Sequence, residues 1–256
     1  TIIITIILLV SLLSNAQYYV SGQDKGSTKW MQIKTESFRL VFPDYAEKQA
    51  QILANNLEKC IPHLSEDINN SAKRIDIIMH METATSNGMV MWAPKRMELF
   101  NTPSQDIESH DWWGHLALHE YRHVLQVDKL NQGMTKALSY LLGQQATGAV
   151  LGLYLPLWYI EGDAVVVETK FSSAGRGRNP NFNRGLRTQL IEKGKYSYDK
   201  AYFGSYKDFV PNHYVLGYHM VVQANRMYGE DFWNQHVDFV AKNPYAVAPF
   251  AWSLKK

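Results

Sequence analysis

Residues 119–123 read His119-Glu120-Tyr121-Arg122-His123, inside a stretch, roughly 111–130, whose pattern predicts a helix. Two histidines four positions apart lie on one face of a helix, within reach of a single metal ion. Glu120 follows the first histidine directly, so it points beside that ion, where the general base of a zinc hydrolase belongs. The apolar neighbours of the motif predict that the helix is buried: Ala117, Leu118, Val124, Leu125 and Val127. A buried His-Glu-His cluster needs partners, and a bound metal supplies them.

A second motif, Trp158-Tyr159-Ile160-Glu161-Gly162-Asp163-Ala164, follows further along the chain and predicts a helix over 158–171. Together the H-E-x-x-H and W-x-x-E-G-x-A patterns resemble the gluzincin zinc metallopeptidases. The resemblance implies that Glu161 is the third Zn²⁺ ligand beside His119 and His123, and that Glu120 activates the attacking water. Two histidines and one glutamate leave the fourth tetrahedral position open, as a catalytic site requires.

The resemblance also implies a substrate-binding edge strand just before the metal helix. We expect a turn at Asn87-Gly88 followed by a hairpin of two short strands, 89–93 and 97–100. An unpaired strand edge offers backbone donors and acceptors to a peptide. The aminopeptidase branch of the family carries G-x-M-E-N here, which 88–92 (Gly-Met-Val-Met-Trp) does not match, so internal cleavage is favoured. Glu98 is a candidate for binding a free amine, but we favour a solvated strand residue.

A late helix is predicted over 211–228, begun by Pro211 and Asn212 and closed by Gly229. By the same resemblance, Tyr214 near its start is the candidate donor to the oxyanion that develops during attack on a carbonyl. His213 and Tyr218 are the alternatives behind it.

Three polar positions near the two motifs have candidate supporting roles. Glu168 is seven positions after Glu161 and shares its helix face, so it either orients a ligand histidine or forms a surface salt bridge. Asp163 points elsewhere. His115 lies one turn before His119 and is a candidate neighbour of the ligands rather than a ligand.

Two further stretches are distinctive in composition. The segment 172–187 reads as a loop with the chain's only basic cluster, Arg176, Arg178, Arg184 and Arg187. We favour a solvated or subunit-facing loop over recognition of substrate carboxylates. The segment 134–155 is apolar and punctuated by glycines; it predicts packed helices without a membrane span, with a membrane-surface role as the less favoured alternative.

The remaining periodicity predicts ordinary secondary structure. Two short strands are expected within 30–42, a helix from Pro43 to about Pro62, a strand over 74–81 in which His80 is a satisfied core or edge residue, and a helix over 232–240.

Composition narrows the class of protein. The chain has 256 residues and a formal net charge of +2, and its basic residues are mostly scattered, so nucleic acid is not an expected partner. The single cysteine, Cys60, excludes an intramolecular disulfide and a cysteine-based metal site, and we expect it to be a small buried apolar residue.

The first residues predict export. Residues 1–16 form an apolar run with small residues at Ser14 and Ala16, typical of a secretory signal peptide that is incomplete at its start and cut after Ala16; an uncleaved anchor is the alternative. Export without disulfides suits the periplasm or surface of a Gram-negative bacterium. We expect 17–29 to be a flexible leader and 243–256 to begin a further C-terminal region.

The predicted fold class is α+β and zincin-like: a sheet-containing half over 30–130 that carries the H-E-x-x-H helix, and a helical half over 131–242 that carries Glu161. The predicted function is a Zn²⁺-dependent endopeptidase of the bacterial cell envelope, with a peptide or protein substrate. The alternatives are a catalytically silent zincin-fold scaffold in an envelope complex, a metal-dependent hydrolase of non-protein amides, and a chance motif in a buried helical core.

Overall fold

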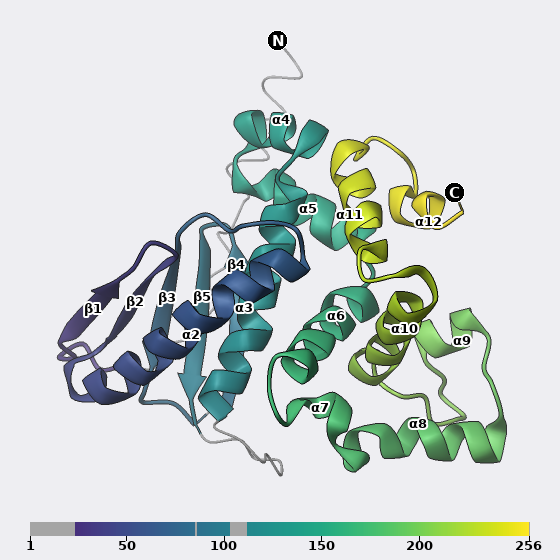
Figure 1. Ribbon diagram of the computed structural model, residues 1–256, viewed down its shortest axis with the longest axis horizontal. Coiled ribbons are helices and arrows are strands. Elements are labelled where there is room, and N and C mark those ends of the chain that lie inside the picture. The colour runs from purple at the N-terminus through teal and green to yellow at the C-terminus, as the bar shows by residue number, and fades with distance from the viewer. Residues whose placement is uncertain (1–23, 85, 103–111, 256) are drawn as a thin grey trace.

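The computed structural model describes residues 24–84, 86–102 and 112–255 (Figure 1). The predicted signal peptide, most of the predicted leader and Asp111 lie outside these ranges. The mixed sheet and mainly helical second half confirm the predicted α+β class.

A five-stranded mixed sheet occupies the N-terminal half, in the order β1-β2-β3-β5-β4. Its strands are Trp30–Lys34 (β1), Phe38–Pro43 (β2), Ile75–His80 (β3), Ser86–Trp92 (β4) and Lys95–Asn101 (β5). β2, β3 and β5 run parallel, whereas β1 and β4 are antiparallel to their neighbours. The predicted edge strand is therefore β4. The predicted turn at Asn87-Gly88 is wrong, because both residues pair with β5 inside the strand.

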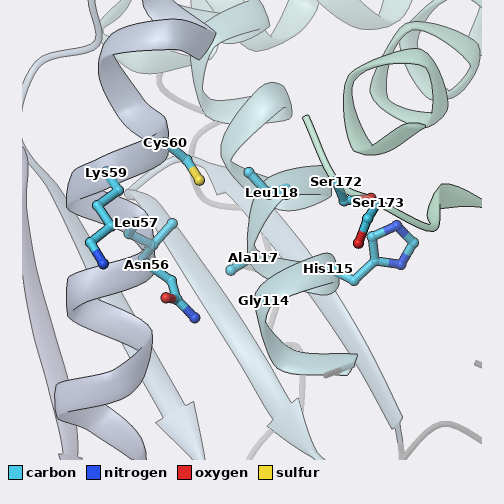
Figure 2. A pocket seen from close by; sticks show the side chains of 10 residues that line it. All are labelled: Asn56, Leu57, Lys59, Cys60, Gly114, His115, Ala117, Leu118, Ser172 and Ser173. Atoms are coloured by element: carbon cyan, nitrogen blue, oxygen red, sulfur yellow. The ribbon is translucent and has the colours of Figure 1, made fainter. Parts of the chain in front are cut away.

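Two long helices pack with the sheet: α2 (Glu47–Asp67), entered through the short helix η1 (Asp44–Ala46), and α3 (Trp112–Leu130). α2 continues beyond its predicted end at Pro62, because Ile61 and Leu64 extend the apolar stripe that packs into the core. This packing outweighs the loss of one backbone donor at the proline. Between α2 and α3 lies a cavity of about 280 Å³, and its lining includes Cys60, His115 and Ser173 (Figure 2).

In the described part of the second half, all regular secondary structure is helical. Its helices are α4 (Gly133–Leu142), α5 (Gln144–Tyr154), α6 (Leu157–Lys170), α7 (Gly175–Arg178), α8 (Pro180–Lys193), α9 (Tyr198–Phe203), α10 (His213–Tyr228), α11 (Phe232–Lys242) and α12 (Pro249–Ser253). The helices predicted at α6, α10 and α11 are confirmed. The predicted loop over 172–187 is wrong, because α7 and half of α8 lie there. Asn179 caps α8, accepting a hydrogen bond from the backbone of Asn181, and Pro180 begins the helix.

The described residues form two apolar cores, and α3 belongs to both. Leu116, Val124 and Leu125 of α3 join the core beneath the sheet and α2, whereas Leu130 joins a second core built on α5, α6, α10, α11 and α12. α3 is thus held from both sides, and the motif at its centre lies where the two cores meet. No single helix in the described ranges is long and apolar enough to cross a membrane; α5 and α6 meet that criterion only as a pair, bent by 98°.

Candidate metal centre

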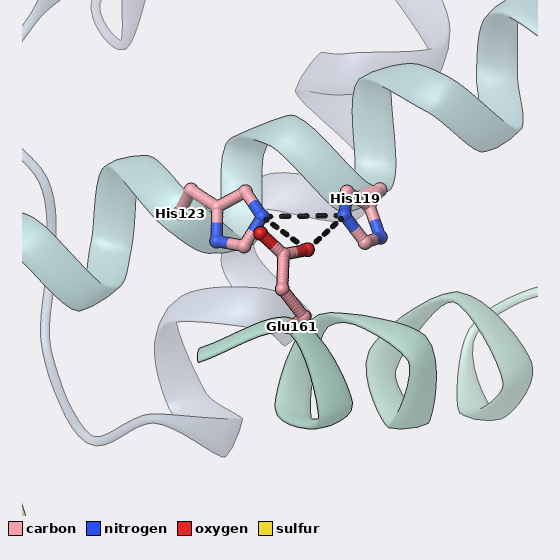
Figure 3. Close-up of side chains that lie close together, drawn as sticks. All are labelled: His119, His123 and Glu161. Carbon is pink, nitrogen blue, oxygen red and sulfur yellow. Dashed lines mark hydrogen bonds and ion pairs between the residues drawn. The ribbon is translucent and has the colours of Figure 1, made fainter. Parts of the chain in front are cut away.

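Three side chains from α3 and α6 converge on one point (Figure 3). Nε2 of His119 lies 3.2 Å from Nε2 of His123 and 3.2 Å from Oε2 of Glu161. Nε2 of His123 lies 3.4 Å from the same Glu161 oxygen. Among the described residues, these three form the one group of His, Cys, Asp and Glu side chains arranged to share a metal ion.

The triangle of ligand atoms has the dimensions of a zinc site. With metal–ligand bonds of about 2.0–2.1 Å, the corners of a tetrahedron lie about 3.3 Å apart. The sides found here, 3.2, 3.2 and 3.4 Å, match one face of that tetrahedron. His119, His123 and Glu161 therefore fit a tetrahedral cation, and the three-ligand set leaves the fourth corner for a non-protein ligand.

Both imidazoles are held by their second nitrogen. His123 Nδ1 lies 2.8 Å from Oε1 of Gln126, and His119 Nδ1 lies 3.1 Å from Oε2 of Glu168. When each Nδ1–H donates to its oxygen acceptor, each Nε2 lone pair is directed at the shared point. Glu168 is buried and lies within hydrogen-bonding distance of His119, so the surface salt bridge considered for it is wrong.

Glu168 is in turn held by Arg176, a residue of the predicted basic cluster. Arg176 donates from Nε to Oε1 of Glu168 at 2.6 Å and from Nη2 to Oε2 at 2.9 Å. Nη2 also lies 2.8 Å from His119 Nδ1, but only the carboxylate can accept both sets of protons. The solvated role favoured for this arginine is therefore wrong; Arg184 and Arg187, by contrast, are exposed.

The electrostatics of the cluster favour positive charge at its centre. Burial raises the pKa of Glu161, but hydrogen bonds with His119 and His123 outweigh it and hold that pKa well below its usual range. Burial lowers the pKa of His123, yet Glu161 outweighs it and raises that pKa to about 9. Burial also raises the pKa of Glu168, but His119 and Arg176 lower it to about 2. Carboxylates kept ionised beside two imidazoles are the donor set a divalent cation needs.

Glu120 is separate from the three converging side chains and lies against β4. A Cβ added to Gly88 of β4 would lie only 2.8 Å from the Glu120 carboxylate oxygen Oε1. The edge strand can approach the carboxylate this closely because residue 88 has no side chain. Burial raises the pKa of Glu120 above its usual value, and the nearby histidines partly offset this. The carboxylate therefore lies beside both the metal centre and the strand edge.

Of the three aromatic candidates on α10, Tyr214 lies nearest the centre. Its ring centroid is 6.2 Å from that of His119, and the guanidinium carbon of Arg176 lies 4.9 Å from the Tyr214 ring centroid. Burial and the charge of Glu161 raise the pKa of Tyr214 to about 12, so its hydroxyl keeps its proton at neutral pH. Tyr218 packs instead against Gly177 and Phe182.

The glycine of the second motif explains how α10 reaches the centre. A Cβ on Gly162 would overlap the backbone of Gly217, and a Cβ on Gly217 would overlap the carbonyl of Trp158. α6 and α10 therefore cross with their backbones in contact, and this close approach carries Tyr214 toward the ligands.

A buried ion pair joins α3 to α6 on the side away from the metal ligands. Arg122 donates to both carboxylate oxygens of Asp163, at 2.7 and 2.8 Å, and its Nη1 lies 2.9 Å from Asp67 Oδ2. Gln126 donates to the same aspartate at 2.7 Å while accepting from His123. Asp163 thus faces away from the centre, as predicted, and ties one ligand helix to the other.

The remaining predicted residues lie elsewhere. His115 lies 4.0 Å from Glu168, outside the ligand triangle. His80 is a buried histidine whose Nδ1 lies 2.6 Å from Asp24 and whose Nε2 lies 3.6 Å from Glu98, too far for a hydrogen bond. The solvated role favoured for Glu98 is wrong, because its carboxylate is buried and lies 2.5 Å from Arg96. Cys60 is only partly buried, and burial raises the pKa of its thiol.

Sequence reasoning missed Gln126, Arg122 and the role of Arg176. Gln126 follows His123 by three positions on the same helix, a spacing that places the two side chains together, so it could have been found. Arg122 acts through Asp163, 41 positions away in the chain, and Arg176 acts through Glu168, which lies on another helix. Neither pairing can be recognised before the fold is known. The sequence matches no protein-family model and no curated protein.

Proposed function

We propose that the chain is a zinc-dependent endopeptidase related to the gluzincins. The observation that supports this best is the triangle of His119, His123 and Glu161 with zinc dimensions, together with the Glu120 carboxylate next to it. A purely structural zinc site closes all four positions with protein ligands, whereas three ligands leave room for water and substrate.

The chain's own residues supply the remaining chemistry. Zinc, when bound, supplies the Lewis acidity that activates water and polarises a carbonyl. Glu120 takes the proton from the attacking water and delivers it to the leaving amine as the peptide bond breaks. Tyr214, protonated at neutral pH, donates a hydrogen bond to the carbonyl oxygen as negative charge develops on it.

The β4 edge is the proposed binding site for an extended peptide. Within the described sheet β4 pairs only with β5, so its other edge can bind a substrate strand. Gly88 places this edge against Glu120, next to where the scissile bond must lie. Glu98, the candidate for binding a free amine, is held by Arg96 and His80. This favours cleavage within a chain over removal of its first residue.

The proposed location is the cell envelope, outside the cytoplasm. It is supported by residues 1–16, which lie outside the described ranges. There the substrate would be a peptide or protein of the envelope.

The decisive experiment combines metal analysis with a cleavage assay on purified wild type, Glu120→Gln and the exposed control Glu192→Gln. We expect about one zinc per chain in all three proteins. Cleavage of a mixed peptide library should fall about 10²- to 10⁴-fold in Glu120→Gln alone, because a general base is lost while every ligand remains.

Four outcomes would contradict the proposal. Full activity of Glu120→Gln would show that Glu120 is not the general base. Bound zinc without turnover of peptides or of non-peptide amides favours the scaffold, and turnover of the amides alone favours the other hydrolase. Metal content at background in both wild type and His119→Ala would mean that the motif binds no metal.

A further inference from the structure

Helices α4 and α5 and the segment 243–252 turn apolar side chains toward solvent. Leu141 is 84% exposed, Leu153 is 75% exposed and Val247 is 86% exposed. The exposed large apolar residues of these segments are Met134, Tyr140, Leu141, Leu142, Leu153, Tyr245, Val247 and Trp252. We call this set the apolar face. Exposed apolar groups gathered in this way mark surfaces that bind something.

The segments of the apolar face are fastened to one another. α4 packs against both α5 and α11. Thr135 of α4 donates a hydrogen bond to Ala241 O at 2.8 Å, and Tyr154 of α5 donates one to Pro244 O at 2.8 Å. In Figure 1, α4, α11 and α12 gather in the upper part, away from α7 and α8. The segments that carry the apolar face therefore form one folded unit.

Charge around the apolar face has one sign. No Asp or Glu occurs between Lys129 and Ile160, or anywhere after Asp238. Exposed lysines border the face: Lys136, Lys242 and Lys255. The nearest acid, Asp238, is already engaged, 3.0 Å from Lys129 and 2.6 Å from Gln132. An apolar surface with a basic border complements an anionic lipid surface.

We propose that the apolar face rests on an anionic lipid membrane, with α4 and α5 lying in the headgroup region. The helices have 10 and 11 residues, which is about 15–17 Å at 1.5 Å per residue and half of what spanning requires. Tyr140, Tyr245 and Trp252 are of the type that accumulates at the boundary between lipid and water. This inference is independent of the metal chemistry.

A second copy of the chain fits the face less well. In a two-fold dimer the same patch meets itself. The lysines of both copies, Lys136 and Lys242 among them, would then be brought into one interface, without acids on the face to offset the repulsion. Anionic headgroups supply the missing negative charge.

The test is flotation of the full chain with vesicles of phosphatidylcholine alone or mixed with phosphatidylglycerol. The test variant is Leu141→Ser/Leu142→Ser/Leu153→Ser. The matched control is Leu190→Ser/Ile191→Ser/Phe203→Ser, whose residues are exposed on α8 and α9. We expect wild type and control to bind the anionic vesicles, more weakly at high salt, and the test variant to bind at least about tenfold less.

A site-specific readout separates this face from the apolar residues 1–16 that every variant carries. A spin label at Leu142→Cys, in a Cys60→Ser background, should gain accessibility to oxygen when anionic vesicles are added, whereas a label at Ile191→Cys should not. An unchanged label at position 142, or equal binding of the test variant and wild type, overturns the proposal. So does a wild-type dimer that the test variant converts to monomer, because a second copy then covers the face.

Discussion

Helices α4, α5 and α6 follow one another in the chain, yet α6 turns charged side chains toward the interior while α4 and α5 turn apolar side chains toward solvent. α6 turns its acids inward: Glu161 faces two histidines, Asp163 faces Arg122, and Glu168 is held by Arg176. α4 and α5 turn leucines outward, with acids nowhere in their sequence.

Acids that face inward and leucines that face solvent are both unusual, and they indicate different things about a protein. A buried carboxylate costs several kcal/mol unless it is paired. α6 carries two buried carboxylates, Asp163 and Glu168, and the partly buried Glu161, and each of the three has a partner in the fold. An exposed leucine forgoes roughly 25 cal/mol for each Å² left in water, which a bound surface would recover. The inward carboxylates of α6 therefore indicate a functional site, whereas the exposed leucines of α4 and α5 indicate a surface that binds a partner.

The largest effect on stability is expected at the inward side, for Asp163→Ala. The substitution removes the bidentate partner of Arg122 and leaves a buried guanidinium with Asp67 alone. Breaking a buried pair in this way costs about 3–5 kcal/mol. Urea unfolding measures it, with the exposed Asp199→Ala as a control expected within about 0.5 kcal/mol of wild type. A cost below about 1 kcal/mol would show that α3 and α6 are held together by packing alone.

Much of this inward side could be predicted from the sequence. Helical spacing places His119 and His123 together, and the second motif supplies Glu161. Asn212 caps α10 where its side chain accepts from Val215, as the sequence predicts. The histidine spacing and the cap are local, because each depends on residues within a turn or two of one another. Glu161 is distant in the chain and was predicted from the family resemblance.

The parts that were predicted wrongly depend on contacts between one element and the next, which the periodicity of a single element does not show. The segment 172–187 has no apolar stripe, so nothing local indicates α7; it is held by Arg176 reaching Glu168 and by Gly177 donating to Thr169. Glu98 has the alternation of a strand residue, but the pairing of β3 with β5 brings His80 near it, and Arg96 lies two positions away on the same strand. Periodicity does not encode which strand or helix comes to lie beside another.

The next largest effect is expected for Arg176→Gln, on metal affinity. The guanidinium fixes the carboxylate that orients His119, and loss of such an outer contact typically lowers metal affinity about 10- to 100-fold. The metal affinity of Arg176→Lys should lie between those of the wild type and Arg176→Gln, because lysine keeps the charge but not the paired hydrogen bonds. Competition with a coloured zinc chelator measures this. The control is Arg187→Gln, because Arg187 belongs to the same predicted cluster but is exposed. Equal zinc affinities for Arg176→Gln and Arg187→Gln would show that Arg176 does not influence the metal centre.

A smaller effect extends the comparison to a buried polar group in the sheet. Burial lowers the pKa of His80, but Glu98 and Asp24 outweigh it and raise the pKa above the unfolded value of about 6.5. The resulting stabilisation is complete below pH 6.5 and is lost as pH rises through the raised pKa. The difference in unfolding free energy between wild type and His80→Gln should therefore shrink from pH 6 to pH 8.5. A difference that stays constant would mean that His80 contributes no charge.

The smallest effect is expected on the outward side, and α5 contains both halves of the test. Val150 is 5% exposed and joins the second core, whereas Leu153, one turn later, is 75% exposed. Val150→Ala should cost on the order of 2 kcal/mol by leaving a cavity, whereas Leu153→Ala should change the free energy of unfolding by less than about 0.5 kcal/mol. Thermal and urea unfolding of the two variants, without lipid, measure the pair. If Leu153→Ala costs as much as Val150→Ala, protein already covers the apolar face, and the inverted polarity of α4–α5 reflects a contact within the protein rather than a surface available to lipid.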